Sequence, residues 1–171
     1  IKNFGFNIST IKNILAISQS GKRFLSPTHT AVINRNFLEI HPIVKQEPAV
    51  FYIESDQGFV EHPLQLTLKI LPSENLEISK ETSTAYLDYE KIQFPLQLRH
   101  WKPGDYFYPI GMNTKKKLSD FFIDNKLSLN EKENTFVLVS GTDIVWIIGQ
   151  RISNKYKITR QSKNVLKIEM R

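Results

Sequence analysis

The sequence predicts an α+β fold that is mainly β: a β-sandwich-like C-terminal domain of mixed topology with two short helices, preceded by a small helix-plus-hairpin segment. Most apolar residues fall in short runs bounded by turn residues, which is typical of strands, and few segments show helical spacing. A chain of 171 residues that is 40% hydrophobic can bury one sizeable core or two small ones.

The opening part of the chain predicts a helix followed by a β-hairpin. In residues 4–18 isoleucines recur at spacings close to one helical face, and Asn7 or Ser9 could supply the N-cap. Residues 22–40 then indicate strands, with a turn at residues 34–36 between two β-rich pairs.

A domain boundary is expected in residues 41–48, which are largely polar and carry two prolines. We therefore divide the chain into residues 1–45 and residues 46–171. Beyond the boundary, short apolar runs predict strands. They are residues 50–54, 64–71, 76–79, 85–89, 96–99, 106–108, 136–139, 144–148 and 165–168. Residues 117–125 and 129–134 predict the two short helices.

The positive charge belongs to the second half of the chain. Residues 1–90 carry 8 Lys and Arg against 10 Asp and Glu, whereas residues 91–171 carry 15 against 7, a net charge of +8. A phosphate backbone selects such an excess, because each neutralised phosphate releases condensed counterions. A surface that is merely well solvated is the equally favoured alternative.

Motifs of an independent catalyst are missing from the sequence. The seven glycines are scattered, so no Gly-rich phosphate loop leads into a helix. The four histidines lack metal-ligand spacing, and without cysteine there is no thiolate nucleophile or disulfide. Apolar runs are too short for a membrane span. We expect a soluble, cytoplasmic piece of a longer protein, with no membrane partner and no metal or cofactor of its own.

Residues 94–126 combine two ingredients of nucleic-acid binding, basic side chains and flat rings. The basic candidates for phosphate contact, with one added from later in the chain, are Arg99, Lys102, Lys115, Lys116, Lys117, Lys126 and Arg151. The candidates for stacking are Trp101, Tyr106 and Tyr108. On composition alone, core packing of the aromatic rings and a solvated face of lysines are the favoured explanations.

Six short motifs follow one another in a fixed order and change that balance. They are Pro-Leu-x-Leu-Arg (95–99), Trp-x-Pro-Gly-Asp (101–105), Pro-x-Gly-Met (109–112), Lys-Lys-Leu-Ser-Asp-Phe-Phe (116–122), Ile-Val-Trp (144–146) and Gly-x-Arg-Ile (149–152). This order resembles the C-terminal domain of bacterial tRNA(Ile)-lysidine synthases, a β-sandwich module also similar to one in the phenylalanyl-tRNA synthetase β subunit. The start of the chain resembles, more weakly, the end of the middle, substrate-binding region of that family.

The resemblance implies a role in tRNA modification. Enzymes of this family are ATP-dependent ligases that join lysine to the wobble cytidine of tRNA(Ile). ATP and Mg²⁺ act in an N-terminal catalytic domain with a Ser-Gly-Gly-x-Asp-Ser loop, which this sequence does not contain. The chain would then dock the tRNA body and acceptor stem beside its own N-terminal catalytic domain, without catalysing a reaction alone.

Two alternatives remain open at the level of sequence. Exposed aromatic residues suit a protein interface as well as they suit bases, so an interdomain module or a homodimer is the first alternative. A standalone enzyme is the second, and the missing phosphate loop and nucleophile argue against it.

Overall fold

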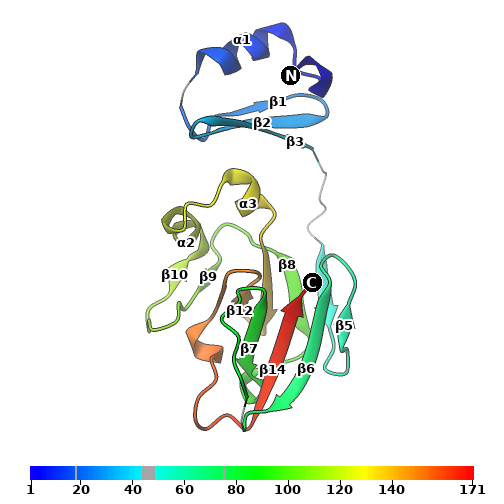
Figure 1. The fold of residues 1–171 in the computed structure, drawn as a ribbon, viewed down its shortest axis with the longest axis vertical. Helices are drawn as coiled ribbons and strands as arrows, with labels where there is room; N and C mark the ends of the chain where they lie inside the picture. The colour runs from blue at the N-terminus through cyan, green and yellow to red at the C-terminus, as the bar shows by residue number, and fades with distance from the viewer. Residues whose placement is uncertain (18, 44–48, 75) are drawn as a thin grey trace. The chain divides into compact units, whose positions relative to one another are not determined.

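A computed structural model of the chain describes residues 1–17, 19–43, 49–74 and 76–171 (Figure 1). It divides into two compact units, Ile1–Glu47 with Lys126–Glu133, and Pro48–Asn125 with Asn134–Arg171. The boundary predicted between residues 45 and 46 falls in residues 44–48, which lie outside the described residues, so that boundary stays a prediction.

The first unit contains a short 3₁₀ turn, η1 (Lys2–Phe4), and one α-helix, α1 (Ile8–Ala16). Asn7 is the N-cap of α1, and its side-chain oxygen accepts a hydrogen bond of 2.8 Å from the backbone N–H of Thr10. A cap of this kind satisfies one of the free amides at a helix start. Of the two N-caps that the sequence allowed, the structure therefore selects Asn7.

An antiparallel sheet of three strands accompanies α1: β1 (Arg23–Leu25), β2 (His29–Asn34) and β3 (Phe37–Pro42), in that order. The predicted hairpin is confirmed as β2 and β3, joined at Arg35, whose φ of 55° is left-handed. Helix and sheet share a small core, in which Phe6, Ile14 and Ala31 are buried.

The second unit is built from two larger antiparallel sheets. One has the strand order β13-β12-β11-β8-β4 and the other the order β5-β6-β14-β7. The strands of the first are β4 (Val50–Ile53), β8 (Leu96–His100), β11 (Phe136–Ser140), β12 (Asp143–Ile147) and β13 (Arg151–Ile152). Those of the second are β5 (Phe59–Val60), β6 (Leu66–Pro72), β7 (Thr84–Asp88) and β14 (Asn164–Met170).

The two sheets share one hydrophobic core, as a sandwich requires. Leu98 of β8 and Trp146 of β12 belong to the same buried cluster as Leu66 of β6 and Leu166 of β14. The fold class, α+β and mainly β with a sandwich, is confirmed. Its topology is not mixed in strand direction, because every pairing among the described strands is antiparallel.

The remaining elements are a short ribbon, two short helices and two 3₁₀ turns. The two-stranded ribbon is β9 (Tyr106–Phe107) with β10 (Lys116–Lys117), and α2 (Leu118–Asp124) follows it directly. The helix α3 (Leu129–Glu133) groups with the first unit. Two 3₁₀ turns are η2 (Tyr89–Lys91) and η3 (Asn154–Tyr156). Both predicted short helices are confirmed, whereas the strand predicted at residues 76–79 is wrong because those residues form an irregular segment.

Candidate nucleic-acid interface

Arg99 lies at the end of β8 and is held by Asp105. Its two terminal guanidinium nitrogens donate to the two carboxylate oxygens of Asp105 at 2.8 and 2.9 Å. The same carboxylate accepts a hydrogen bond of 2.8 Å from the backbone N–H of Lys102, which closes the turn at Pro103 and Gly104. A bidentate pair of this kind is geometrically specific. The Arg of the first motif therefore positions the turn of the second.

The ribbon β9–β10 sorts its side chains by alternation. Tyr106 lies directly opposite Lys117, and Phe107 lies opposite Lys116. Directly opposed residues point to the same face of a sheet, and neighbours along a strand point to opposite faces. Phe107 is buried and packs edge-to-face on Phe121 of α2, with ring centroids 5.1 Å apart. Burial of Phe107 consequently directs Tyr106 and Lys117 to the other, outward face.

Two tyrosines and two lysines are in contact at this outward face. The ring centroids of Tyr106 and Tyr108 are 6.3 Å apart in an edge-to-face arrangement. The ammonium of Lys115 lies 4.7 Å from the centroid of Tyr106, and that of Lys155 lies 4.0 Å from the centroid of Tyr108. Such cation–π contacts hold charge and ring surface side by side. With Lys117, these four residues form what we call the tyrosine–lysine patch.

One lysine of the patch is paired with a carboxylate. A hydrogen bond from Lys155 to Asp143, at 3.1 Å, raises the pKa of Lys155 above its ordinary value. Within the described parts of the chain, neither Lys115 nor Lys117 forms a salt bridge. The patch therefore presents the ammonium groups of Lys115 and Lys117 without a salt-bridge partner, beside that of Lys155, which is paired with Asp143.

Asn154 ties the distant segment η3 to the loop that follows β9. Its backbone N–H donates to the carbonyl of Tyr108 at 2.6 Å, and its side-chain oxygen accepts from the N–H of Gly111 at 3.2 Å. Its side-chain amide donates to the carbonyl of Met112, also at 3.2 Å. This clamp places Lys155 over Tyr108. Sequence reasoning missed both Asn154 and Lys155, although they lie within three residues of the end of the last family motif, at residues 149–152.

Comparison with known proteins identifies the family. A family model described as TilS substrate binding domain matches residues 1–43, and one described as TilS substrate C-terminal domain matches residues 96–169. The tRNA(Ile)-lysidine synthase of Parabacteroides distasonis is 40% identical over 169 residues, which are 97% of this chain and 39% of that protein. The chain belongs to the tRNA(Ile)-lysidine synthase family.

A second relative agrees with this membership, and a solved structure shares the fold. The tRNA(Ile)-lysidine synthase of Bacteroides thetaiotaomicron is 32% identical over 167 residues, 95% of this chain and 36% of that protein. The chain thus spans less than two fifths of the length of these two relatives. A crystal structure described as that of the TILS C-terminal domain shares the fold, with a TM-score of 0.57 and 16% identity over 73% of this chain and 97% of that one.

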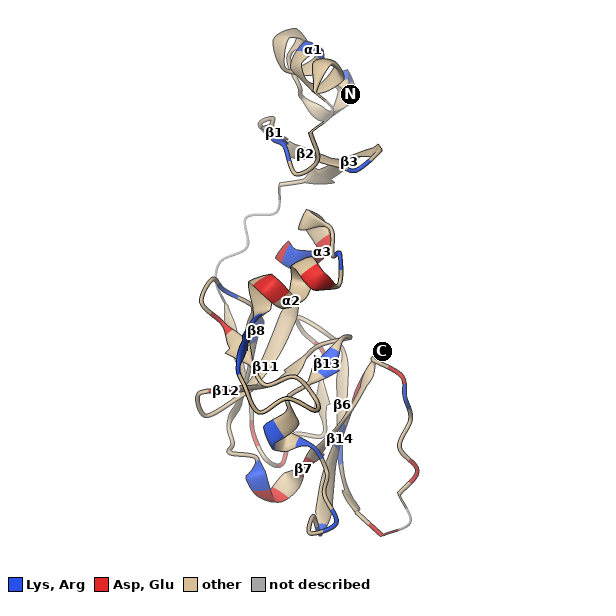
Figure 2. Ribbon diagram, turned by 90° about the vertical axis from the view of Figure 1, so that its left-hand side faces the viewer, with Lys and Arg blue, Asp and Glu red and all other residues tan. Residues whose placement is uncertain are grey.

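Within this member of the tRNA(Ile)-lysidine synthase family, the predicted basic residues do not all gather at one place. Lys and Arg of the second unit lie on several separate segments (Figure 2). Arg99 is only 14% exposed and is engaged by Asp105, and Lys116 pairs with Asp124 of α2. Lys126 groups with the first unit, and Arg151 lines a cavity. Lys102 is exposed in the turn before β9. Only Lys115 and Lys117 of the predicted seven join the patch.

The three predicted stacking residues fall into two groups, one packed and one accessible. Trp101 is half-buried and meets the buried Phe122 edge-to-face, with centroids 5.0 Å apart, which fits a packing role. Tyr106 is 39% exposed and Tyr108 is half-buried, so their rings remain accessible at the patch.

Among the described residues, no group of three or more His, Asp or Glu is arranged to hold a metal ion. No helix of the described segments is long and apolar enough to span a bilayer.

Proposed function

We propose that this chain is the tRNA-binding part of a tRNA(Ile)-lysidine synthase and that the tyrosine–lysine patch contacts the tRNA. Family membership supports the ligand, and the patch supplies the two groups that RNA binding uses, namely cations for phosphates and rings for sugars or bases. The observation that carries the proposal is the contact of Lys115 and Lys155 with the two tyrosines while Lys117 lies directly across from Tyr106.

The proposed contact with tRNA is largely electrostatic. Stems of folded RNA are A-form, and their deep major groove does not admit side chains, so proteins grip them through phosphates, 2′-hydroxyls and shape. An outward-facing patch of lysines and tyrosines suits that mode, with the tRNA body or acceptor stem as the region docked. Lys102, in the turn that Asp105 closes, is a further candidate for phosphate contact.

The reaction itself belongs, in this proposal, to the rest of the enzyme. The whole protein would act in the cytoplasm as an ATP-dependent ligase that joins lysine to the wobble cytidine of tRNA(Ile), with ATP and Mg²⁺ bound by an N-terminal catalytic domain. This chain would hold the tRNA so that its anticodon reaches that domain. An interdomain or homodimer interface is the rival use of the exposed tyrosines.

Reversal of two charges tests the proposed contact. The variant Lys115→Glu/Lys117→Glu should bind a tRNA(Ile) transcript at least roughly tenfold more weakly, because two phosphate contacts become repulsive. In filter binding, its salt dependence should flatten by about 1 in the log–log slope for each phosphate that is no longer neutralised. The matched control is Lys69→Glu/Lys163→Glu, which changes the net charge equally at exposed positions on β6 and just before β14.

The control variant should bind tRNA nearly as the unmodified chain does. If the patch variant and the unmodified chain bind equally at both low and high salt, the patch has no role in RNA binding. Light scattering of the chain with and without tRNA tests the rival explanation. A homodimer that forms without RNA, and that is less stable when Tyr106 is replaced, would favour a protein interface.

A further inference from the structure

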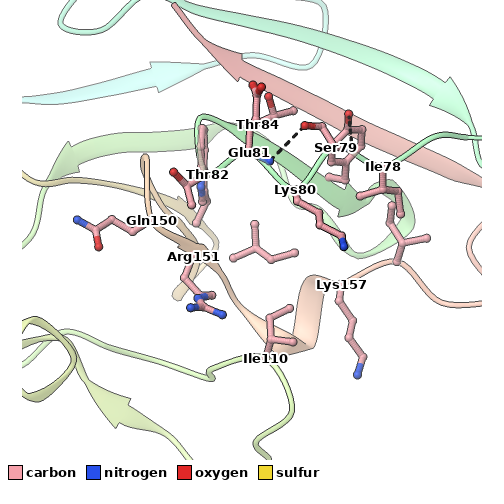
Figure 3. Close-up of a pocket in the computed structure, with 14 residues that line it drawn as sticks. Ile78, Ser79, Lys80, Glu81, Thr82, Thr84, Ile110, Gln150, Arg151 and Lys157 are labelled. Carbon is pink, nitrogen blue, oxygen red and sulfur yellow. Dashed lines mark hydrogen bonds between the residues drawn. The ribbon is translucent and has the colours of Figure 1, made fainter. Parts of the chain in front are cut away.

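A second feature of the sandwich unit is a cavity of about 490 Å³, separate from the residues of the tyrosine–lysine patch (Figure 3). The irregular segment before β7 forms one side, and β13 with the chain after η3 forms another. The residues that line it are Ile78, Ser79, Lys80, Glu81, Thr82, Thr84, Tyr86, Ile110, Trp146, Gln150, Arg151, Ile152, Lys157 and Ile158. Its volume is in the range of small-ligand sites, about 300–1,000 Å³.

Four isoleucines line the cavity. Two of them, Ile78 and Ile110, are 56% and 43% exposed, and they lie on different sides of the opening (Figure 3). The buried Trp146 adds further apolar surface. Isoleucines exposed on two sides of one opening leave apolar surface in water, which a flat apolar group placed between them would cover.

Three cations surround these apolar walls: Lys80, Arg151 and Lys157. All three are exposed, and in the portion of the chain that the structure describes none of them forms a salt bridge. The lining contains a single carboxylate, that of Glu81. The cavity therefore favours a ligand that combines an anionic group with an apolar part.

The segment that carries Ile78 and Lys80 is fixed by hydrogen bonds although it has no regular structure. The backbone N–H of Ser79 donates to the hydroxyl of Tyr86 at 3.3 Å, and the N–H of Glu81 donates to the Ser79 hydroxyl at 3.2 Å. Tyr86 belongs to β7, so the rim is attached to the sheet. This side of the cavity is thus anchored to β7.

We infer that this cavity binds one unpaired nucleotide of the RNA, with its base between the isoleucines and its phosphate against Lys80, Arg151 and Lys157. This inference rests on the proposed function, because it takes RNA as the ligand. Paired bases stay stacked inside a helix and cannot enter a concave site, whereas unpaired bases can be turned outward into one. Thr82, Thr84 and Gln150 supply hydrogen-bonding groups for the edge of a base.

Arg151 thereby keeps the phosphate contact expected from the sequence, but makes it apart from the other predicted basic residues. It contacts RNA within a site for a single nucleotide, and the tyrosine–lysine patch contacts the paired stem. The two sites predict different substrate preferences: the cavity prefers single strands, and the patch prefers duplex.

The test compares two RNA probes and two variants of the chain. The probes are a fluorescently labelled four-nucleotide single strand and a blunt-ended RNA duplex, measured by anisotropy at one salt concentration. The variant Arg151→Ala/Lys157→Ala should weaken binding of the single strand at least tenfold and change binding of the duplex by less than twofold. The patch variant Lys115→Glu/Lys117→Glu should do the reverse.

A structural readout accompanies the affinities. In methyl NMR spectra, the single strand should shift the resonances of Ile78, Ile110, Ile152 and Ile158, and the same spectra show that each variant is folded. A matched control, Lys69→Ala/Lys163→Ala, removes two exposed lysines outside the cavity and should leave binding of the single strand within twofold of the unmodified chain.

Three results would overturn the inference. They are no binding of the single strand at low salt, unchanged binding by the cavity variant, and tighter binding of a short acidic peptide than of the single strand in the cavity. If the chain binds tRNA(Ile) while any of these holds, only the cavity assignment fails. If it binds neither tRNA nor duplex, the proposed function fails as well.

Discussion

At the scale of single residues, the partner of a cation decides what the cation can do. Arg99 has both terminal nitrogens of its guanidinium engaged by Asp105, and so it stabilises a turn. Lys115 instead lies over the ring of Tyr106, with its charge available to a phosphate. An arginine and a lysine that were equal candidates in the sequence are therefore expected to have different functions.

Tyr106 offers a test at this scale. Replacement by leucine keeps an apolar side chain but removes the ring that holds Lys115 in place, so Tyr106→Leu should weaken tRNA binding by about two- to fivefold, which corresponds to the roughly 0.5–1 kcal/mol of an exposed cation–π contact. Because no charge changes, the salt slope should stay as it is. Tyr106→Phe keeps the ring and should bind normally.

The control for this substitution is Tyr52→Leu, which alters a tyrosine of β4 that is 59% exposed and outside the patch. It should leave tRNA affinity unchanged. Equal weakening by Tyr106→Leu and Tyr52→Leu would mean that loss of any exposed ring has this effect, and the patch assignment would fail.

At the scale of elements, the ribbon β9–β10 shows the limit of predicting strands from a sequence. The strand at residues 106–108 was predicted and β9 is found there, but β10 was not predicted because two residues are too short to show any alternation. Residues 76–79, Leu-Glu-Ile-Ser, alternate apolar and polar side chains as a strand does, yet they form an irregular rim, in which the N–H of Ser79 donates to the hydroxyl of Tyr86. Whether a short segment forms a strand depends on residues far away in the sequence with which it pairs.

The pair of Arg99 and Asp105 predicts a stability effect on the turn before β9. Asp105 is 7% exposed and Arg99 14%, so Asp105→Ala leaves a largely buried guanidinium without its partner. We expect a loss of about 3 kcal/mol in the free energy of unfolding. Urea titration followed by tryptophan fluorescence measures it.

A matched substitution on α2 controls for the loss of an aspartate. Asp124 pairs with Lys116, but its side chain is 61% exposed, and exposed ion pairs contribute at most about 1 kcal/mol. Asp124→Ala should therefore cost much less than Asp105→Ala. Similar costs for the two variants would show that Arg99 does not depend on Asp105.

At the scale of the whole molecule, composition and short runs were enough to predict a mainly β fold with two short helices. They could not predict that β14, from the end of the chain, lies between β6 and β7, because strand order follows from which apolar faces meet across a core. Four of the five residues of the tyrosine–lysine patch were among the candidates named from the sequence. Lys155 escaped because the clamp of Asn154 joins segments far apart in the sequence.

The two proposed RNA sites also concern the whole molecule. A patch for paired RNA and a cavity for one unpaired nucleotide would let a single sandwich unit recognise a stem together with a free base. Both sites lie within the second unit, so they do not require any particular placement of the first.

The most direct test of the central claim is the salt dependence of tRNA(Ile) binding by the unmodified chain. Between about 50 and 200 mM salt, the logarithm of the binding constant should fall linearly with the logarithm of salt concentration, because phosphate contacts release counterions. A slope near about −3 or steeper corresponds to at least about three or four phosphate contacts. Binding that does not change with salt, or no binding at the lowest salt, would contradict the account.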